Sequence, residues 1–198
     1  MPLLASEHAS VDTSRQTTTI PRELTDGDRD LIAAARAKAF VLYEGRRVPH
    51  RSCGVALAET FNLPTRPYQS LRRGGVTGEG ECGAIKAGEL IIGEFLGDPD
   101  PTGPVTPSLR AAAIQYRDAW RRRVDLGPAG PGGSIVCNVL TSPFHDFRSE
   151  ERQSFCTNIA ASVAEIVAEI LLRFGATFEI TAIPGLSDQG ESSPQGAP

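Results

Sequence analysis

Four cysteines are the residues of this sequence that are best suited to chemistry, and they are Cys53, Cys82, Cys137 and Cys156. Separations of 29, 55 and 19 residues exclude a CxxC pair, so spacing alone gives only a weak metal signal. Thiolates bind zinc or iron–sulfur clusters, and two thiols can form a disulfide. Cysteine also packs as a small apolar side chain, so four plain core cysteines remain an alternative.

The local sequence around each cysteine indicates that the four thiols converge. Cys53 and Cys82 each stand at or near the start of a predicted helix, where unpaired amides and the helix dipole favour a thiolate. Cys156 lies on the apolar stripe of the last predicted helix, and Cys137 follows the loop GPAGPGGSIV. Because like charges repel in a low dielectric, four thiolates need a metal centre among them, or disulfides that remove the charge.

A glycine-rich stretch, GGVTGEGECG, contains Cys82 and leads into the helix predicted to begin there. Glycine allows backbone amides to surround a bound group without side-chain crowding, and such amides tune thiolates and clusters. The candidate cofactor-binding glycines are therefore Gly74, Gly75, Gly78, Gly80 and Gly83. A flexible surface loop is the alternative, and the absence of GxxxxGK[ST] argues against a phosphate-binding P-loop.

Three further polar residues lie close to the cysteines in the sequence. His50 would be a ligand or proton carrier beside Cys53, or a simple loop histidine. Lys86, one turn beyond Cys82, would lower the pKa of that thiol or extend into water. Glu89, seven residues after Cys82, would accept a proton coupled to electron transfer or face water.

The hydrophobic pattern that must position these residues is helical. We predict an all-α fold, a small bundle of about five helices with Gly/Pro-rich loops, within a single domain at residues 26–183. The predicted helices cover about 27–43, 52–62, 82–96, 107–123 and 149–174, with a short segment at 135–140 and a short strand in ATFEITAI, residues 176–183. Composition predicts a flexible arm at 1–25 and a disordered tail at 184–198.

Composition also narrows the classes of partner. With 198 residues and a net charge of −4, the chain lacks the basic balance of a nucleic-acid-binding protein. Its apolar stretches are interrupted by glutamates, so no membrane insertion is expected. The first residues do not have the pattern of a secretory signal, which favours a cytoplasmic, reducing setting where thiols persist or bind metal.

Taken together, four segments resemble the C_GCAxxG_C_C family of redox-active proteins. The segments are RSCGVALAETFNLP, ECGAIKAGELIIGEFLG, GGSIVCNVL and FCTNIAASVAEIVAEIL, within residues 30–174. One position departs from the signature, because Ala87 stands where the motif has glycine and Gly88 follows it. The resemblance implies redox activity and assigns a four-cysteine site to Cys53, Cys82, Cys137 and Cys156.

The leading interpretation is an iron–sulfur cluster, with 2Fe–2S favoured, that transfers electrons to an unidentified redox partner protein. A second interpretation is a metal-free thiol/disulfide switch with Cys53 and Cys82 as the low-pKa, catalytic pair. A third is a structural protein whose cysteines bind zinc or only pack. A homo-oligomer remains open, and covalent haem is not expected because CxxCH is absent.

Overall fold

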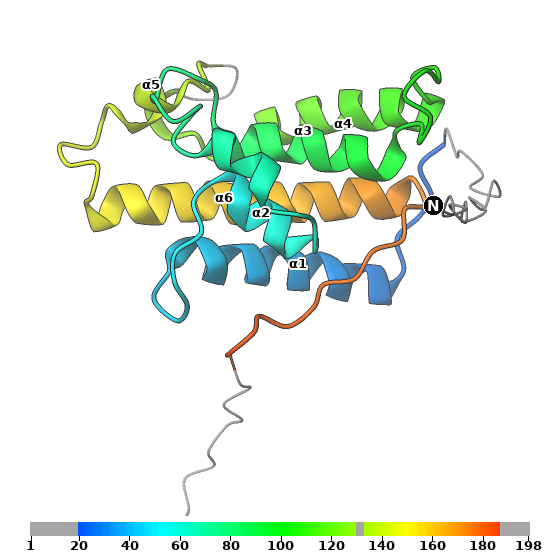
Figure 1. Ribbon diagram of the computed structural model, residues 1–198, viewed down its shortest axis with the longest axis horizontal. Coiled ribbons are helices and arrows are strands. Elements are labelled where there is room, and N and C mark those ends of the chain that lie inside the picture. The colour runs from blue at the N-terminus through cyan, green and yellow to red at the C-terminus, as the bar shows by residue number, and fades with distance from the viewer. Residues whose placement is uncertain (1–19, 130–132, 187–198) are drawn as a thin grey trace, which may run out of the picture.

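The computed structural model describes residues 20–129 and 133–186, which form an all-α bundle, as predicted (Figure 1). The α-helices are α1 (Asp26–Glu44), α2 (Gly54–Thr60), α3 (Gly83–Leu96), α4 (Pro107–Arg123), α5 (Cys137–Thr141) and α6 (Glu150–Arg173). Two 3-10 helices, η1 (Arg66–Leu71) and η2 (Gly127–Ala129), complete the described elements. The five predicted helices are confirmed, and the predicted segment at 135–140 overlaps α5, which ends one residue later, at Thr141.

Helix α6 is the central element of the bundle. In Figure 1 it runs horizontally through the middle, with α1 below it, α3 and α4 above it and α2 in front. Its alanines are fully buried at Ala160, Ala161, Ala164 and Ala168, and such small side chains permit close helix packing. By length and composition α6 would also suit a membrane span, but 67% of its most apolar window is buried, as expected for a core helix.

Helix α3 also carries small residues where neighbours approach closely. A Cβ atom on Gly88 would lie 2.1 Å from the Tyr116 hydroxyl, which donates a hydrogen bond of 2.7 Å to the Ile85 carbonyl. Ala87 is fully buried. The departure from the family signature at this turn therefore leaves glycine at the position where the fold requires it.

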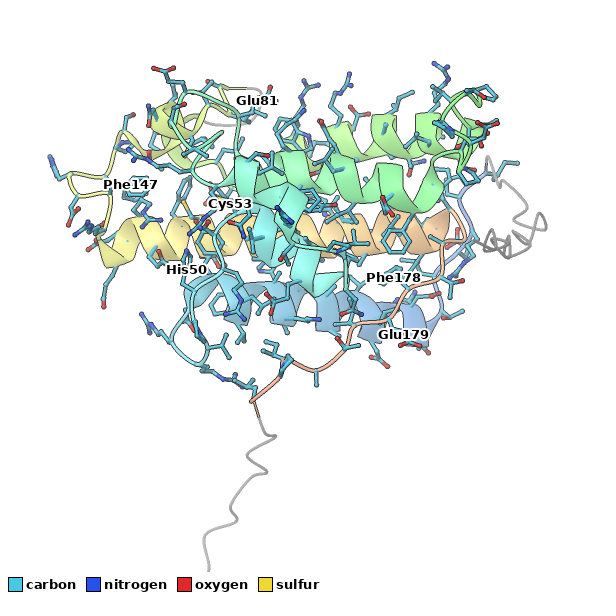
Figure 2. All side chains as sticks on the ribbon, in the orientation of Figure 1. His50, Cys53, Glu81, Phe147, Phe178 and Glu179 are labelled. Carbon is cyan, nitrogen blue, oxygen red and sulfur yellow. The ribbon has the colours of Figure 1, made fainter. Side chains whose placement is uncertain are left out.

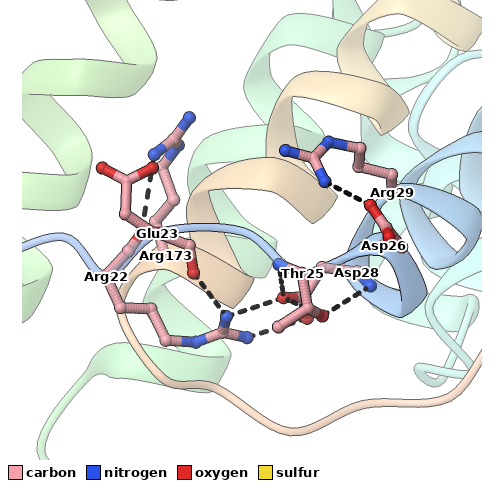
Figure 3. A network of polar contacts seen from close by, with 7 residues as sticks. All are labelled: Arg22, Glu23, Thr25, Asp26, Asp28, Arg29 and Arg173. Carbon is pink, nitrogen blue, oxygen red and sulfur yellow. Dashed lines mark hydrogen bonds and ion pairs between the residues drawn. The ribbon is translucent and has the colours of Figure 1, made fainter.

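Side-chain caps fix the starts of the long helices. At α1, the Thr25 hydroxyl accepts from the Asp28 amide (3.2 Å), and the Asp28 carboxylate accepts from the Thr25 amide (2.7 Å) (Figure 3). Arg22 donates two hydrogen bonds to the same carboxylate and holds the pKa of Asp28 well below its usual range. At α6, the Ser149 hydroxyl accepts from the Arg152 amide, as the predicted N-cap requires.

The predicted strand at 176–183 is wrong, because this segment packs on the helices as irregular chain. Phe178 contacts the rings of Phe61 and Phe95 with centroid distances of 5.4 and 5.9 Å. The Asn62 side-chain amide donates to the Glu179 carbonyl (2.8 Å), so a side chain takes the place of a partner strand. Figure 2 shows Phe178 and Glu179 along this segment.

Both predicted termini lie largely outside the described residues, which exclude 1–19 and 187–198. The described part of the N-terminal arm is attached to the bundle, because the Arg22 amide donates to the Arg173 carbonyl (2.9 Å) at the end of α6.

Candidate functional site

All four cysteines line one cavity of about 230 Å³ at the end of the bundle where α6 begins. Cys53 and Cys82 immediately precede α2 and α3, Cys137 is the first residue of α5, and Cys156 lies in α6. Figure 2 shows His50, Cys53 and Phe147 at this end. The other lining residues are Tyr43, Ser52, Arg72, Arg73, Gly83, Ala84, Leu140, Thr141, Arg152, Phe155 and Ile159, together with His50 and Phe147.

Cys53 occupies an unusual backbone conformation, with φ 44° and ψ −118°. Positive φ is costly for a residue with a side chain and persists only where the surroundings enforce it. Gly83 is part of those surroundings, since a Cβ atom there would lie 2.9 Å from the Cys53 Cβ and 1.9 Å from the Leu71 carbonyl oxygen. Glycine at position 83 therefore allows the cysteines before α2 and α3 to approach one another.

The glycine-rich loop aligns Cys82 with Cys137. The Cys82 amide donates to the Ile135 carbonyl (2.7 Å), and the Cys137 amide donates to the Gly80 carbonyl (2.9 Å). These bonds flank an antiparallel bridge between Glu81 and Val136. Side chains alternate along such a pairing, so Cys82 and Cys137 face the same side, opposite to that of Glu81 and Val136.

The predicted cofactor-binding glycines have different positions and contacts. Gly83 lines the cavity, and a Cβ atom on Gly74 would lie 2.4 Å from the Cys137 Cβ. Gly75 and Gly78 have positive φ and shape the turn. The amides of Gly78 and Gly80 donate to the Gly74 carbonyl (3.2 and 3.0 Å), so they serve the loop rather than a sulfur atom.

Burial dominates the acidity of three of the thiols. It raises the pKa of Cys53, raises that of Cys82 to about 12 and raises that of Cys137 to about 11. The amides of Ala84 and Ile85 lower the pKa of Cys82, but they do so less than burial raises it. Burial therefore opposes the low pKa expected at Cys53 and Cys82, because desolvation outweighs the helix N-termini in the metal-free protein.

Tyr43 is a site residue that the sequence interpretation missed. Its hydroxyl lies 4.0 Å from the Cys53 sulfur, and the side chain is 3% exposed. Burial, and next the neighbouring Cys53 and Cys156, raise the pKa of Tyr43 well above its ordinary value. The sequence did contain a signal of its burial, because Tyr43 follows Ala39 by one turn on the apolar side of α1.

Of the three predicted polar residues, the structure places His50 alone at the cavity. Its ring stacks edge-on against Tyr43 with a centroid distance of 4.9 Å, and its Nδ1 contacts the Tyr43 carbonyl. Desolvation lowers the pKa of His50. Lys86 instead pairs with Glu89 (2.5 Å) and Glu81 (3.4 Å) on the surface, away from the cavity.

Glu89 is exposed, so of the two predicted alternatives the structure shows the one that faces water. The seven-residue spacing was misleading because Cys82 is the N-cap of α3 rather than a residue on its helical stripe. Its side chain therefore does not follow the helical periodicity that the spacing assumes.

Three arginines, Arg72, Arg73 and Arg152, also line the cavity, and the sequence interpretation missed them as well. Among the residues that the structure describes, the lining contains no aspartate or glutamate. The guanidinium carbons of Arg152 and Arg73 lie 4.4 and 4.8 Å from the centroid of the Phe147 ring. Arg152 lies in a highly charged first helical turn that is typical of a solvent-exposed surface, so its sequence carried no signal of burial.

The cavity contains the donors of a metal centre without being arranged as one. In residues 20–129 and 133–186, no group of three or more His, Cys, Asp or Glu side chains is close enough to hold a metal ion. All four cysteines are free thiols. The donor set fits a thiolate-bound centre, since four sulfur-bearing side chains from four segments line one small cavity, and binding would require them to turn inward and lose their protons.

Comparison with known proteins identifies the family. No curated protein and no solved structure matches the chain. The model of the family described as "Putative redox-active protein (C_GCAxxG_C_C)" matches residues 51–170, a span that is more than half of the chain and includes all four cysteines. The chain therefore belongs to the C_GCAxxG_C_C family.

Proposed function

We propose that the cysteine cavity binds an iron–sulfur cluster, with 2Fe–2S favoured, and that the protein passes electrons between redox partner proteins. The observation that carries this proposal is the lining of a single cavity by Cys53, Cys82, Cys137 and Cys156. Four cysteine thiolates are the usual ligands of such a cluster, which supplies one-electron transfer when bound. The proposal includes a reducing, cytoplasmic setting in which the thiols remain available.

The surroundings of the thiols support this proposal electrostatically. A cluster held by four thiolates carries net negative charge. Burial raises the pKa of Cys137, and the positive charges of Arg73 and Arg152 partly oppose that rise. The amides of Ile85 and Ala84 likewise oppose the rise in the pKa of Cys82 that burial causes. Amide and guanidinium groups beside cluster sulfurs raise the reduction potential by stabilising the reduced state.

A thiol/disulfide switch is the second candidate, and the closeness of Cys53 and Cys82 favours it. Burial, and next the neighbouring Cys53, raise the pKa of Cys82. A Cβ atom on Gly83, the residue after Cys82, would lie 2.9 Å from the Cys53 Cβ. By exchange with a disulfide of a partner protein, the two thiols would lose two electrons and two protons, and the partner disulfide would become two thiols. A structural zinc site would use the same four sulfurs without redox chemistry.

The test is anaerobic purification of the full chain and reconstitution with iron and sulfide, followed by a visible spectrum and iron, sulfide and zinc analysis. Each cysteine is changed to serine in turn. Ser142→Ala is the matched control, because Ser142 is an exposed residue just after α5 and outside the cavity lining. We expect a brown wild-type protein and a brown control, with colour bleached by dithionite and lost in all four cysteine variants.

The alternatives give distinct results. A colourless protein that takes up one zinc ion and loses it in each cysteine variant would replace the cluster with a structural metal. A colourless, metal-free protein whose free thiols fall from four to two on oxidation, with no fall in Cys53→Ser or Cys82→Ser, would favour the switch. Full colour in any one of the four cysteine variants would contradict a four-cysteine ligand set.

A further inference from the structure

We propose that the arginine-lined part of the cysteine cavity is an anion-binding site, in which Arg152, with Arg73 and Arg72, holds a small oxyanion or carboxylate beside the thiols. The inference goes beyond the proposed function, because it concerns the arginines of the same cavity and does not require a bound cluster. The binding itself is a property of the metal-free chain.

The strongest observation is the burial of Arg152. The residue is 8% exposed and lines the cavity, and its Nε donates to the Phe147 carbonyl (2.5 Å). A guanidinium carries five N–H donors, and burying its charge is costly without an opposite charge. Within residues 20–129 and 133–186, no carboxylate forms an ion pair with Arg152.

Arg73 and Arg72 add two more guanidinium groups to the same wall. Arg73 and Arg152 both lie against Phe147, which therefore holds two like charges close to one another. Arg72 donates to the neutral side chains of Ser52 (3.0 Å) and Gln69 (3.2 Å). Arg72 and Arg73 are exposed, so water screens their repulsion, and the buried Arg152 is the charge whose cost a bound anion would chiefly offset.

The rest of the cavity wall, within residues 20–129 and 133–186, supplies no fixed negative charge. Besides the arginines, its ionisable groups are four thiols, Tyr43 and His50, and none of these is an acid of carboxylate strength. The cavity of about 230 Å³ is large enough for a small anion. Guanidinium groups recognise planar carboxylates and tetrahedral oxyanions through paired N–H donors, and this geometry defines the class of ligand.

The experiment uses the full chain, metal-free and reduced, at constant ionic strength set with sodium chloride. Sodium sulfate and sodium acetate are titrated in separate arms, and the Nε–Hε resonances of the arginines are followed by NMR. We expect a saturable shift at Arg152 and Arg73 in at least one arm. A shift with sulfate assigns an inorganic oxyanion, whereas a shift with acetate alone assigns a carboxylate.

Variants test whether the shift belongs to the cavity. Arg152→Met and Arg73→Met should each weaken the apparent affinity by about tenfold or more, the usual scale for losing one charged hydrogen-bonding partner. Arg148→Met is the matched control, since Arg148 is an exposed arginine four residues before Arg152 and outside the lining. If Arg152→Met does not fold, Arg73→Met still decides the question.

Two results would overturn the inference. One is the absence of a saturable shift in both arms, and the other is an equal loss of affinity in Arg148→Met. Reconstitution of the wild type with iron and sulfide is run in parallel. A colourless product with intact anion binding would remove the cluster and keep the anion site, whereas a brown product without anion binding would do the reverse.

Discussion

The two halves of α6 differ in whether the arginines beside them form ion pairs. In the second half, glutamates of α6 pair with arginines from three helices, as in Arg36–Glu165 (2.7 Å), Arg123–Glu169 (2.6 Å) and Arg173–Glu169 (3.0 Å). In the first half, Arg152 lines a cavity in whose wall the described part of the chain places no carboxylate. The arginines at the second half form ion pairs within the chain. The proposed partner of Arg152, at the first half, is an anion from solution.

Packing differs between the same two regions. The second half of α6 is fully buried in a compact core at Val163, Ala164, Val167 and Leu171. The first half borders a cavity built from loops in which Cys53, Arg73 and Val76 all have positive φ. One region is therefore optimised for stability and the other stores strain around its thiols, a combination that is typical of functional sites.

The largest expected effect contrasts two glycines of α3. Gly83→Ala places a Cβ atom 1.9 Å from the Leu71 carbonyl oxygen, so the backbone must shift and the free energy of unfolding should fall by about 1–3 kcal/mol or more. A Cβ atom on Gly93 would have no neighbour within 4 Å, and Gly93→Ala should raise the free energy of unfolding by about 0.5–1 kcal/mol. Urea unfolding of the metal-free protein measures both, and equal effects would contradict the assigned close approach.

A second effect follows from the buried thiols. The pKa of Cys82 is about 12 in the folded chain against an ordinary 9.0, so between these pH values the folded state keeps a proton that the unfolded state releases. The free energy of unfolding of the metal-free protein should therefore fall as pH rises above 9, by about 1.4 kcal/mol per pH unit for such a thiol. Chemical unfolding between pH 8 and 11 should show that the free energy of unfolding declines less steeply with pH in Cys82→Ser than in the wild type. An equal decline in the two proteins would contradict the burial of this thiol.

The smallest effect tests the contrast in charge directly. Arg123→Met removes partners from Glu165 and Glu169 and should lower the free energy of unfolding by about 0.5 kcal/mol. Arg152→Met keeps an apolar stem but removes an uncompensated buried charge, so it should be neutral or stabilising in chloride buffer without oxyanions. A larger loss of stability in Arg152→Met than in Arg123→Met would break the comparison.

The fold was predictable because its helices carry clear stripes and caps. Ser149 before two glutamates marked the start of α6, and Gly45 marked the end of α1. The alternation in residues 176–183 misled because Phe178 packs against helices, and a period of two does not reveal which partner an extended chain will find. The short helix η1 was missed because its six residues give too little periodicity.

The four cysteines of the site could be predicted from sequence motifs. The four-segment resemblance selected the cysteines, and the structure brings them to one cavity. The sequence could not show that desolvation governs Cys82, nor that Arg152 is buried, because both depend on which segments meet in space. Lys86 shows that a residue near Cys82 in the sequence can lie outside the site, because its side chain forms an ion pair with Glu89 on the surface.

The bridge between Glu81 and Val136 also sets how this chain tolerates changes in length. Inserting one residue between Gly80 and Cys82 would turn the cysteine to the opposite side of the pairing, because neighbouring side chains in extended backbone alternate. The loop at 98–106, between α3 and α4, is under no such constraint, since lengthening a surface loop costs little free energy. The separation of 55 positions between Cys82 and Cys137 can therefore vary through this loop, whereas the two short stretches that meet at the bridge cannot change in length.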